Sequence, residues 1–247
     1  MEKQERIKLF DQALSLIKDN NIKLFCEELL GNADDYFFHE AASSTGKYHP
    51  TYALGEGGLA RHSIAAALFL NNMFETNCFD FSDKQKDMLI CAAIVHDIKK
   101  YGRVAGRYTV KDHPEIAAEY VMESYNGFID ESDAKYIADA IKTHMGQWGT
   151  EKPSTDAQKV LHIADYLASR KHIEIKFDHP EVVGINESKE TKAELEDPGE
   201  YVFTFGKYNG KKVKEIDPSY LRFIIRSFDN REHPAVVNSE KYLNSLR

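Results

Sequence analysis

The sequence is poor in cysteine and contains no long apolar run. Its three cysteines, Cys26, Cys78 and Cys91, are isolated and form no C-x-x-C pair, so neither a disulfide framework nor a thiolate zinc site is indicated. A reducing cytosol is the expected compartment, either of the source cell or, for a phage-encoded chain, of its host. No run of 18 apolar residues occurs and the first residues, MEKQERIKLFDQ, are charged, so the sequence predicts neither a membrane span nor a signal peptide.

Several common catalytic signatures are absent as well. The sequence has no G-x-x-x-x-G-K-[ST] loop, no G-x-G-x-x-G after a strand and no plausible Ser-His-Asp order near its clustered histidines. These absences disfavour P-loop ATP hydrolysis, dinucleotide redox chemistry and acyl transfer. Positive charge is also scarce, because 32 Lys and Arg are outnumbered by 40 Asp and Glu, for a net charge of −8. A chain of this charge is not expected to coat nucleic acid or anionic membrane with its whole surface.

The first 178 residues have the apolar spacing of helices. Ile7, Phe10, Leu14 and Ile17 recur at intervals of three and four, which predicts an amphipathic helix packed on a larger core. Similar patterns recur up to about residue 172, with a glycine-rich loop near residues 43–58. The expected fold class is therefore mainly α, with a helical domain at residues 1–178.

The composition changes after residue 178. Between residues 181 and 200 seven acidic side chains accompany two lysines without an apolar period, so residues 179–200 are predicted to be an acidic linker. Residues 201–247 carry nine Lys and Arg and five Asp and Glu. Apolar and polar residues alternate there around Asn209-Gly210, a strong hairpin signal, before Asp217-Pro218 begins a short helix. The sequence predicts a small basic α+β module at residues 201–247.

Six ionisable residues occur on helices or helix ends that otherwise read as buried. His144, for example, follows Ile141 by three residues and Ile137 by seven. One such histidine is usually an ordinary core residue, but several together would be costly to bury unless paired or bound to metal. Imidazole and carboxylate ligands suit Mn, Fe, Co, Ni or Zn, and the lack of cysteine favours a catalytic over a structural ion. The expected cofactor is one or two divalent transition-metal ions, with the candidate ligands His62, His96, Asp97, His113, His144 and Asp165.

These residues also match a known pattern. His62, the adjacent His96-Asp97 pair and Asp165 resemble the H…HD…D arrangement of the HD superfamily of metal-dependent phosphohydrolases, over about residues 40–172. The added histidines and the segment HIADYLASR resemble its binuclear branch, which includes symmetrical dinucleoside tetraphosphate hydrolases and cyclic-dinucleotide phosphodiesterases. The resemblance implies a helical bundle in which one metal is held by His62, His96, Asp97 and Asp165, and a second by His113 and His144 with Asp97 as a bridge.

Two details bear on the substrate that the resemblance implies. The G-Y-P element of the cyclic-dinucleotide enzymes is missing, and Lys99 occupies a position where many relatives have glycine. The upstream segment GKYHPTYALGEGGLARHS is similar to HD-type 3′-to-5′ exoribonucleases, although the nucleic-acid-binding barrel of those enzymes has no room here. His49 in this segment either helps to position the substrate or is an ordinary loop histidine.

A basic segment lies between two of the candidate ligands. Residues 99–111 contain no acidic side chain and five basic ones. The basic residues are Lys99, Lys100, Arg103, Arg107 and Lys111. Such a segment is often only a solvated face, but its place between metal ligands predicts contacts with substrate phosphates. Lys100 matches the lysine of the common H-D-x-G-K form, so it is expected to act with Asp97 in catalysis.

The expected function is hydrolysis of phosphoester or phosphoanhydride bonds of a nucleotide or nucleic acid by a metal-bound hydroxide. Dinucleoside polyphosphates, cyclic oligonucleotides, nucleoside triphosphates and RNA or DNA 3′ ends all remain open as substrates. The alternative is a non-catalytic nucleic-acid-binding protein that uses the bundle as a scaffold. A complete ligand set favours the enzyme, because a decayed enzyme would have lost some of the six residues.

The C-terminal segment FTFGKYNGKKVKEIDPSYLRFIIRSF resembles a small FGKYKG-type module at the end of some bacterial and phage exonucleases. Lys207, Lys211 and Lys212 are candidates for contacts with the backbone of a single-stranded nucleic acid, and Tyr208 for base stacking. In the alternative, Tyr208 packs on the helix and the lysines only keep an exposed hairpin soluble.

Overall fold

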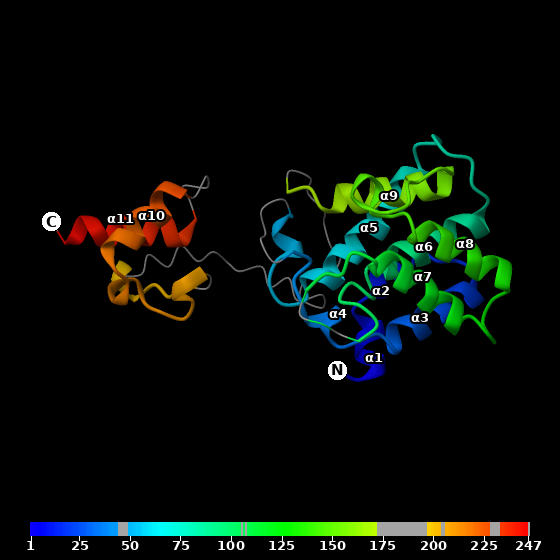
Figure 1. The fold of residues 1–247 in the computed structure, drawn as a ribbon, viewed down its shortest axis with the longest axis horizontal. Helices are drawn as coiled ribbons and strands as arrows, with labels where there is room; N and C mark the ends of the chain where they lie inside the picture. Colours follow the sequence, from blue (N-terminus) through cyan, green and yellow to red (C-terminus); the bar gives the residue numbers. More distant parts are fainter. Residues whose placement is uncertain are drawn as a thin grey trace. The chain divides into compact units, whose positions relative to one another are not determined.

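The computed structural model describes residues 1–43, 49–104, 106, 108–171, 197–203, 206–227 and 233–246. The chain divides into two compact units, Met1–Asn186 and Glu187–Arg247. Figure 1 shows the backbone of both units. Each unit has its own cluster of buried apolar side chains. In the described parts of the chain, no helix combines the length and the apolar character needed to cross a bilayer.

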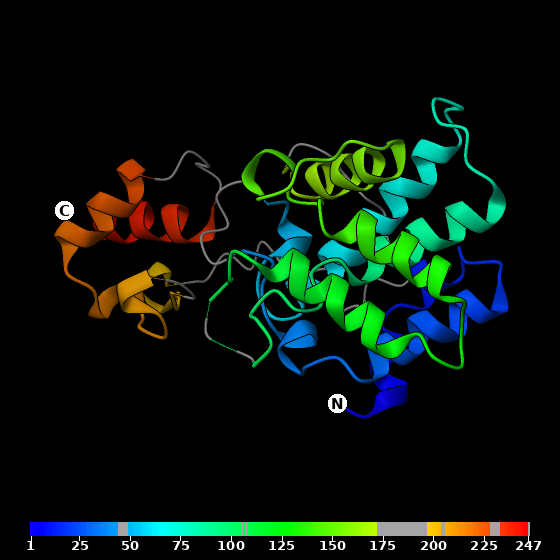
Figure 2. The ribbon, with the colours of Figure 1, turned by 45° about the vertical axis from the view of Figure 1, so that its right-hand side comes forward.

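The N-terminal unit is helical, as the spacing of its apolar residues predicts. Helices α5 and α9 lie side by side, and α1 and α3 lie on the opposite side of the unit from α9 (Figures 1 and 2). The elements are α1 (Lys3–Lys8), α2 (Asp11–Leu14), α3 (Asn20–Gly31), α4 (Tyr36–His39), the 3-10 turn η1 (Thr51–Ala53), α5 (Gly58–Phe74), α6 (Asp83–Val95), α7 (His113–Ser124), α8 (Glu131–Ile141), the 3-10 turn η2 (Gly146–Trp148) and α9 (Asp156–Ala168).

Helix α6 is the centre of this bundle. It begins at a capping box in which the Ser82 hydroxyl accepts from the Gln85 N–H and the Gln85 side chain accepts from the Ser82 N–H. Every residue from Asp87 to Val95 is buried, and the helix contacts α3, α5, α8 and α9. Residues that directly follow α6 therefore lie in the interior of the unit.

Two glycines set the start of α5. Gly57 has a φ of 73°, a left-handed conformation that favours glycine. A Cβ atom on Gly58 would lie 2.3 Å from the carbonyl oxygen of Ala53, so only glycine permits this close approach of η1 to the helix. The turn directs the first turns of α5, which carry His62, into the bundle.

The described residues of the C-terminal unit form three 3-10 turns and two helices. They are η3 (Pro198–Glu200), η4 (Gly206–Tyr208), η5 (Val213–Glu215), α10 (Pro218–Ser227) and α11 (Pro234–Ser245). Helices α10 and α11 contact each other around buried Phe203, Leu221 and Val236. The predicted linker, 179–200, falls mostly outside the described residues, and its last four residues, 197–200, belong to this unit.

The predicted β-hairpin of this unit is reduced to one antiparallel bridge, Val202 with Lys212, in the described residues. The Phe203 N–H donates to the Lys211 carbonyl at 2.9 Å, and Gly210 reverses the chain with a φ of 80°. Two further backbone hydrogen bonds join the two arms, from the Val213 N–H to the Tyr201 carbonyl at 2.8 Å and from the Gly210 N–H to the Phe203 carbonyl at 2.7 Å. The main class of the protein is α, and the described residues do not show the expected α+β character of this module, of which residues 204 and 205 lie outside the described range.

Candidate metal centre

All six predicted metal ligands come together inside the N-terminal unit. Five segments contribute them: α5, the turn after α6, the first residue of α7, the turn after α8, and α9. Five of the six side chains are at most 3% exposed, and that of Asp165 is 16% exposed. The residues brought together are His62, His96, Asp97, His113, His144 and Asp165.

The carboxylate of Asp97 faces two pairs of histidines. Its Oδ1 lies 3.1 Å from His113 Nε2 and 3.6 Å from His144 Nε2. Its Oδ2 lies 3.6 Å from His96 Nε2 and 3.9 Å from His62 Nε2. Each oxygen of the carboxylate is therefore directed to a different pair of imidazole nitrogens.

Asp165 completes the group around His62 and His96. Its Oδ1 lies 3.0 Å from His62 Nε2 and 3.6 Å from His96 Nε2. The ligand atoms of these three residues lie within 4.8 Å of one another, and so do those of His96, Asp97 and His144. Both groups are compact enough for their members to share an ion.

The imidazole rings are oriented as metal ligands. In His96, His113 and His144, Nδ1 lies 2.8 Å from the carbonyl oxygen of the residue three positions earlier. A carbonyl only accepts, so Nδ1 carries the proton and the lone pair of Nε2 faces the carboxylates. The buried Nε2 of His96 has no hydrogen-bond partner among the described residues, which is costly unless an ion satisfies it. The donor set fits a divalent transition-metal ion.

The two aspartates are held in their charged form. Burial alone would raise the pKa of Asp97, but Lys100, whose Nζ lies 2.5 Å from Oδ2, and His96 hold it well below its usual range. Burial is likewise outweighed at Asp165, where His62 and His96 hold the pKa well below normal. Both carboxylates are anionic at neutral pH and are available as ligands.

A cavity of about 310 Å³ opens beside the metal centre. Of the residues predicted to contact substrate, Lys100 and His49 line it. The His49 ring lies 5.8 Å from the His62 ring, and burial, with a smaller effect of His62, lowers the pKa of His49 to about 4. His49 is therefore neutral at pH 7 and can act as a hydrogen-bond donor or acceptor.

The other predicted phosphate ligands have different surroundings. Lys99 Nζ pairs with Asp34 Oδ2 at 2.9 Å, and Arg103 pairs with Glu119. Neither basic residue is among the described residues that line the cavity. Arg107 lies outside the described residues.

Five residues that line this cavity were not predicted from the sequence. They are Met145, Trp148, Tyr166, Ser169 and Arg170. A local signal existed for two of them, because Tyr166 directly follows the predicted ligand Asp165 and Arg170 follows Tyr166 by four residues, one helical turn later.

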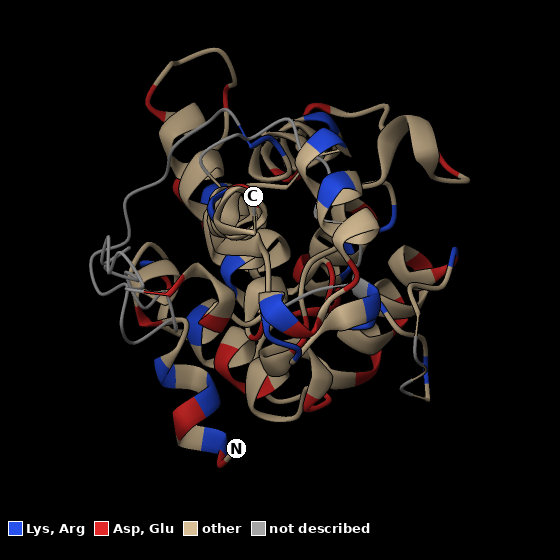
Figure 3. Cartoon of the chain, turned by 90° about the vertical axis from the view of Figure 1, so that its left-hand side faces the viewer, with Lys and Arg blue, Asp and Glu red and all other residues tan. Residues whose placement is uncertain are grey.

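The predicted nucleic-acid contacts lie in the C-terminal unit. Lys207 and Lys211 are exposed, whereas Lys212 Nζ pairs with Glu200 at 2.6 Å. Tyr208 is half-buried and packs against the core of this unit. Figure 3 shows basic positions spread over several elements of the chain rather than gathered on one.

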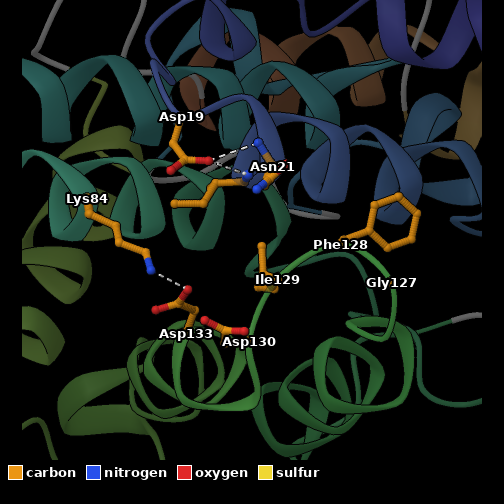
Figure 4. A pocket seen from close by; sticks show the side chains of 9 residues that line it. Asp19, Asn21, Lys84, Gly127, Phe128, Ile129, Asp130 and Asp133 are labelled. Carbon is orange, nitrogen blue, oxygen red and sulfur yellow. Dashed lines mark hydrogen bonds and ion pairs between the residues drawn. The ribbon is translucent and has the colours of Figure 1, made fainter.

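A second cavity, of about 350 Å³, lies in the N-terminal unit between α3, α6 and α8 (Figure 4). Several of its polar groups have partners, since the Asp19 carboxylate accepts from the N–H groups of Asn21 and Ile22, and Lys84 pairs with Asp133 at 2.6 Å. The described residues that line it include no histidine or cysteine. The slightly larger cavity therefore lacks the chemistry of the first.

Comparison with protein families finds an HD domain at residues 59–170. This range contains all six residues of the metal centre. Neither a curated protein nor a solved structure matches the chain significantly. HD domains generally belong to metal-dependent hydrolases, so the match supports an HD-superfamily phosphohydrolase.

Proposed function

We propose that the HD domain at residues 59–170 is a binuclear phosphohydrolase that cleaves phosphoester or phosphoanhydride bonds of a nucleotide or nucleic acid. The observation that carries this proposal is the position of Asp97, whose two carboxylate oxygens face separate pairs of histidines. A carboxylate in that position can bridge two ions, as in two-metal hydrolytic sites.

The ligand set divides around this bridge. His113 and His144 would hold one ion together with Asp97, and His62, His96 and Asp165 would hold the other. A divalent ion of Mn, Fe, Co, Ni or Zn bound there would supply Lewis acidity, which would polarise the phosphoryl group and make water a stronger nucleophile.

The residues of the chain orient the substrate. Lys100 Nζ lies at the cavity and donates to a phosphoryl oxygen, with Asp97 fixing its position. Neutral His49 orients the substrate through a hydrogen bond, and its Nδ1 has no partner in the described part of the chain. The hydroxyl of Ser169, which also lines the cavity, donates to the Asp165 carbonyl oxygen at 3.1 Å. We therefore propose direct hydrolysis without a covalent intermediate on the protein.

The site supports an enzyme over a non-catalytic nucleic-acid-binding scaffold. All six ligands are retained, and their clustered charges would be costly in a buried position that had no further role. In the C-terminal unit, by contrast, one of the three candidate lysines is paired and the candidate tyrosine packs against the core.

The test is a hydrolysis screen of the full chain loaded separately with each candidate metal. The panel contains a dinucleoside polyphosphate, a cyclic dinucleotide, a nucleoside triphosphate and single-stranded RNA and DNA, with products separated by chromatography. Asp97→Asn should abolish turnover. Asp87 is a buried aspartate on α6 that accepts from the Lys18 and Asp19 N–H groups. The control variant Asp87→Asn should retain turnover. The proposal would be refuted if no member of the panel gave a hydrolysis product.

A further inference from the structure

An exposed tryptophan lies at the mouth of the catalytic cavity. Trp148 is the only tryptophan in the sequence, and 55% of its surface is exposed. It lines the same cavity as Asp97, His144 and Asp165. An exposed indole next to a buried polar centre is available to a ligand that enters the cavity.

The backbone around Trp148 is fixed. Lys152 Nζ donates to three carbonyl oxygens of this turn at 3.1, 2.9 and 3.1 Å, those of Gly146, Gln147 and Gly149. Three hydrogen bonds from one ammonium group restrict the conformations of this turn. A restricted turn lowers the entropy cost of binding a ligand to the indole.

The same turn is tied to the metal centre. Nδ1 of His162 lies 2.7 Å from the carbonyl oxygen of His144, and its Nε2 lies 3.1 Å from Gln147 Oε1. Gly146 has a φ of 52°, and a Cβ atom there would lie 2.2 Å from the His162 ring. Trp148 therefore has a defined position relative to the ligand His144.

Trp148 is part of a stack of planar groups. Its ring is stacked with that of Tyr166, with centroids 6.0 Å apart and planes at 11°. The guanidinium carbon of Arg170 lies 3.8 Å from the centroid of the Tyr166 ring. The Nε atom of Arg170 is buried and has no hydrogen-bond partner among the described residues. Flat apolar faces and a cation thus lie together beside the metal centre.

We infer that this stack is a nucleobase-binding subsite, in which the base of the substrate stacks on Trp148 and its phosphate contacts Arg170 and Lys100. A planar base extends a stack of parallel rings, and base stacking on aromatic side chains is tolerant of sequence. The shared ligand chemistry is a phosphate that bears a nucleobase, either in a free nucleotide or at the end of a single strand. The inference rests on the proposed phosphohydrolase function and specifies its substrate class.

The binding test uses Trp148 as its own reporter. Because no other tryptophan is present, the tryptophan fluorescence of the full, metal-loaded chain reports on this site alone. Adenosine monophosphate should quench it saturably, whereas ribose 5-phosphate at the same concentrations should not. A homo-oligonucleotide that quenches at lower concentration than the mononucleotide identifies a nucleic-acid end as the source, and equal or weaker quenching identifies a free nucleotide.

Variants separate stacking from general structural effects. Calorimetric titration should show that Trp148→Leu weakens adenosine monophosphate binding by roughly 10-fold or more. Trp148→Phe keeps a ring and should retain most of the affinity. Phe223→Leu is the matched control, because Phe223 is 57% exposed but lies in the C-terminal unit, and it should bind as wild type. Metal content should be the same in all four proteins.

Two results would overturn the subsite. One is wild-type affinity for adenosine monophosphate in Trp148→Leu, and the other is equal quenching by ribose 5-phosphate and adenosine monophosphate. Either would refute the subsite even if the chain hydrolyses phosphoesters. Conversely, Trp148-dependent nucleotide binding without hydrolysis of any panel member would support the subsite and refute the proposed catalytic function.

Discussion

Replacing Lys100 by glutamine tests which part of the basic segment contacts the substrate. Lys100 Nζ lies 2.5 Å from Asp97 Oδ2, and its 13% exposed side chain lines the cavity beside the candidate metal centre. The adjacent Lys99 is also 13% exposed, but its Nζ pairs with Asp34 at 2.9 Å and lies 4.6 Å from the centre of the Tyr120 ring. Two neighbouring lysines of equal burial therefore have different partners.

The expected magnitudes follow from these surroundings. A charge-assisted hydrogen bond contributes about 1.5–3 kcal/mol, so kcat/KM of Lys100→Gln should fall by roughly 10- to 150-fold. Lys99→Gln removes an ion pair and should lower the free energy of unfolding by about 1 kcal/mol or less. For a chain of this size that corresponds to a decrease in Tm of at most about 2–4 °C, with kcat/KM unchanged.

The assay compares initial rates of wild type and both variants at saturating metal, on the substrate that the hydrolysis screen identifies. Thermal melts and metal analysis of the same preparations show whether each variant is folded and loaded. Equal losses of kcat/KM in the two variants, or none in Lys100→Gln, would refute the assignment of Lys100 to the substrate and Lys99 to the fold.

Three further predictions concern metal, acid and the C-terminal unit. Chelation should lower Tm by several degrees in wild type and in Asp87→Asn but not in Asp97→Asn, because an ion at 100 times its Kd stabilises the folded chain by about 2.7 kcal/mol. Equal decreases in Tm in all three proteins would count against a metal site at Asp97. The metal-free chain should lose stability as the pH falls below about 4. The depressed pKa values of Asp97 and Asp165 contribute to the free energy of unfolding above the unfolded pKa, and this contribution is lost when the carboxylates are protonated. Urea melts between neutral and acidic pH measure this loss, and a free energy of unfolding that does not change with pH would contradict it. Replacing Lys207 and Lys211 with glutamine should flatten the salt dependence of single-strand binding by about 1.4 in log–log slope if both contact phosphates, whereas an unchanged slope in anisotropy titrations would leave the unit with a packing role.

The clustering of the six candidate ligands could be predicted because their positions are locally unusual. His96 and Asp97 follow a helix whose residues from Asp87 to Val95 are all buried, and few arrangements explain ionisable residues there. His144 follows Ile141 by three residues, and its Nδ1 atom lies 2.8 Å from the Ile141 carbonyl oxygen. Local spacing was sufficient for these residues because the helices impose it.

The ion pair of Lys99 could not be predicted in the same way. The resemblance to the H-D-x-G-K form singled out Lys100, but the pairing of Lys99 depends on the tertiary position of Asp34, 65 residues earlier. The stack of Trp148 on Tyr166 likewise depends on how η2 meets α9. Composition and periodicity carry no information about such pairings.

The turn of the predicted hairpin carries a local signal, whereas the extent of its strands does not. Asn209-Gly210 does reverse the chain, and Gly210 has the positive φ that such a turn requires. In the described residues Val202 and Lys212 form one antiparallel bridge, and residues 204 and 205 lie outside those residues. How far the flanking residues continue as strands depends on tertiary packing, which the local pattern does not specify.

The metal content of the full chain tests the central claim most directly. The chain is loaded with excess Mn or Zn, freed of unbound ion and measured by elemental analysis. We expect about two ions per chain, since a carboxylate that faces two sets of histidines can bridge two metals. We expect about one ion for His113→Ala, which removes a ligand from one side of Asp97 only. A wild-type chain that retains no more than one ion after loading with any of the candidate metals would contradict the binuclear site.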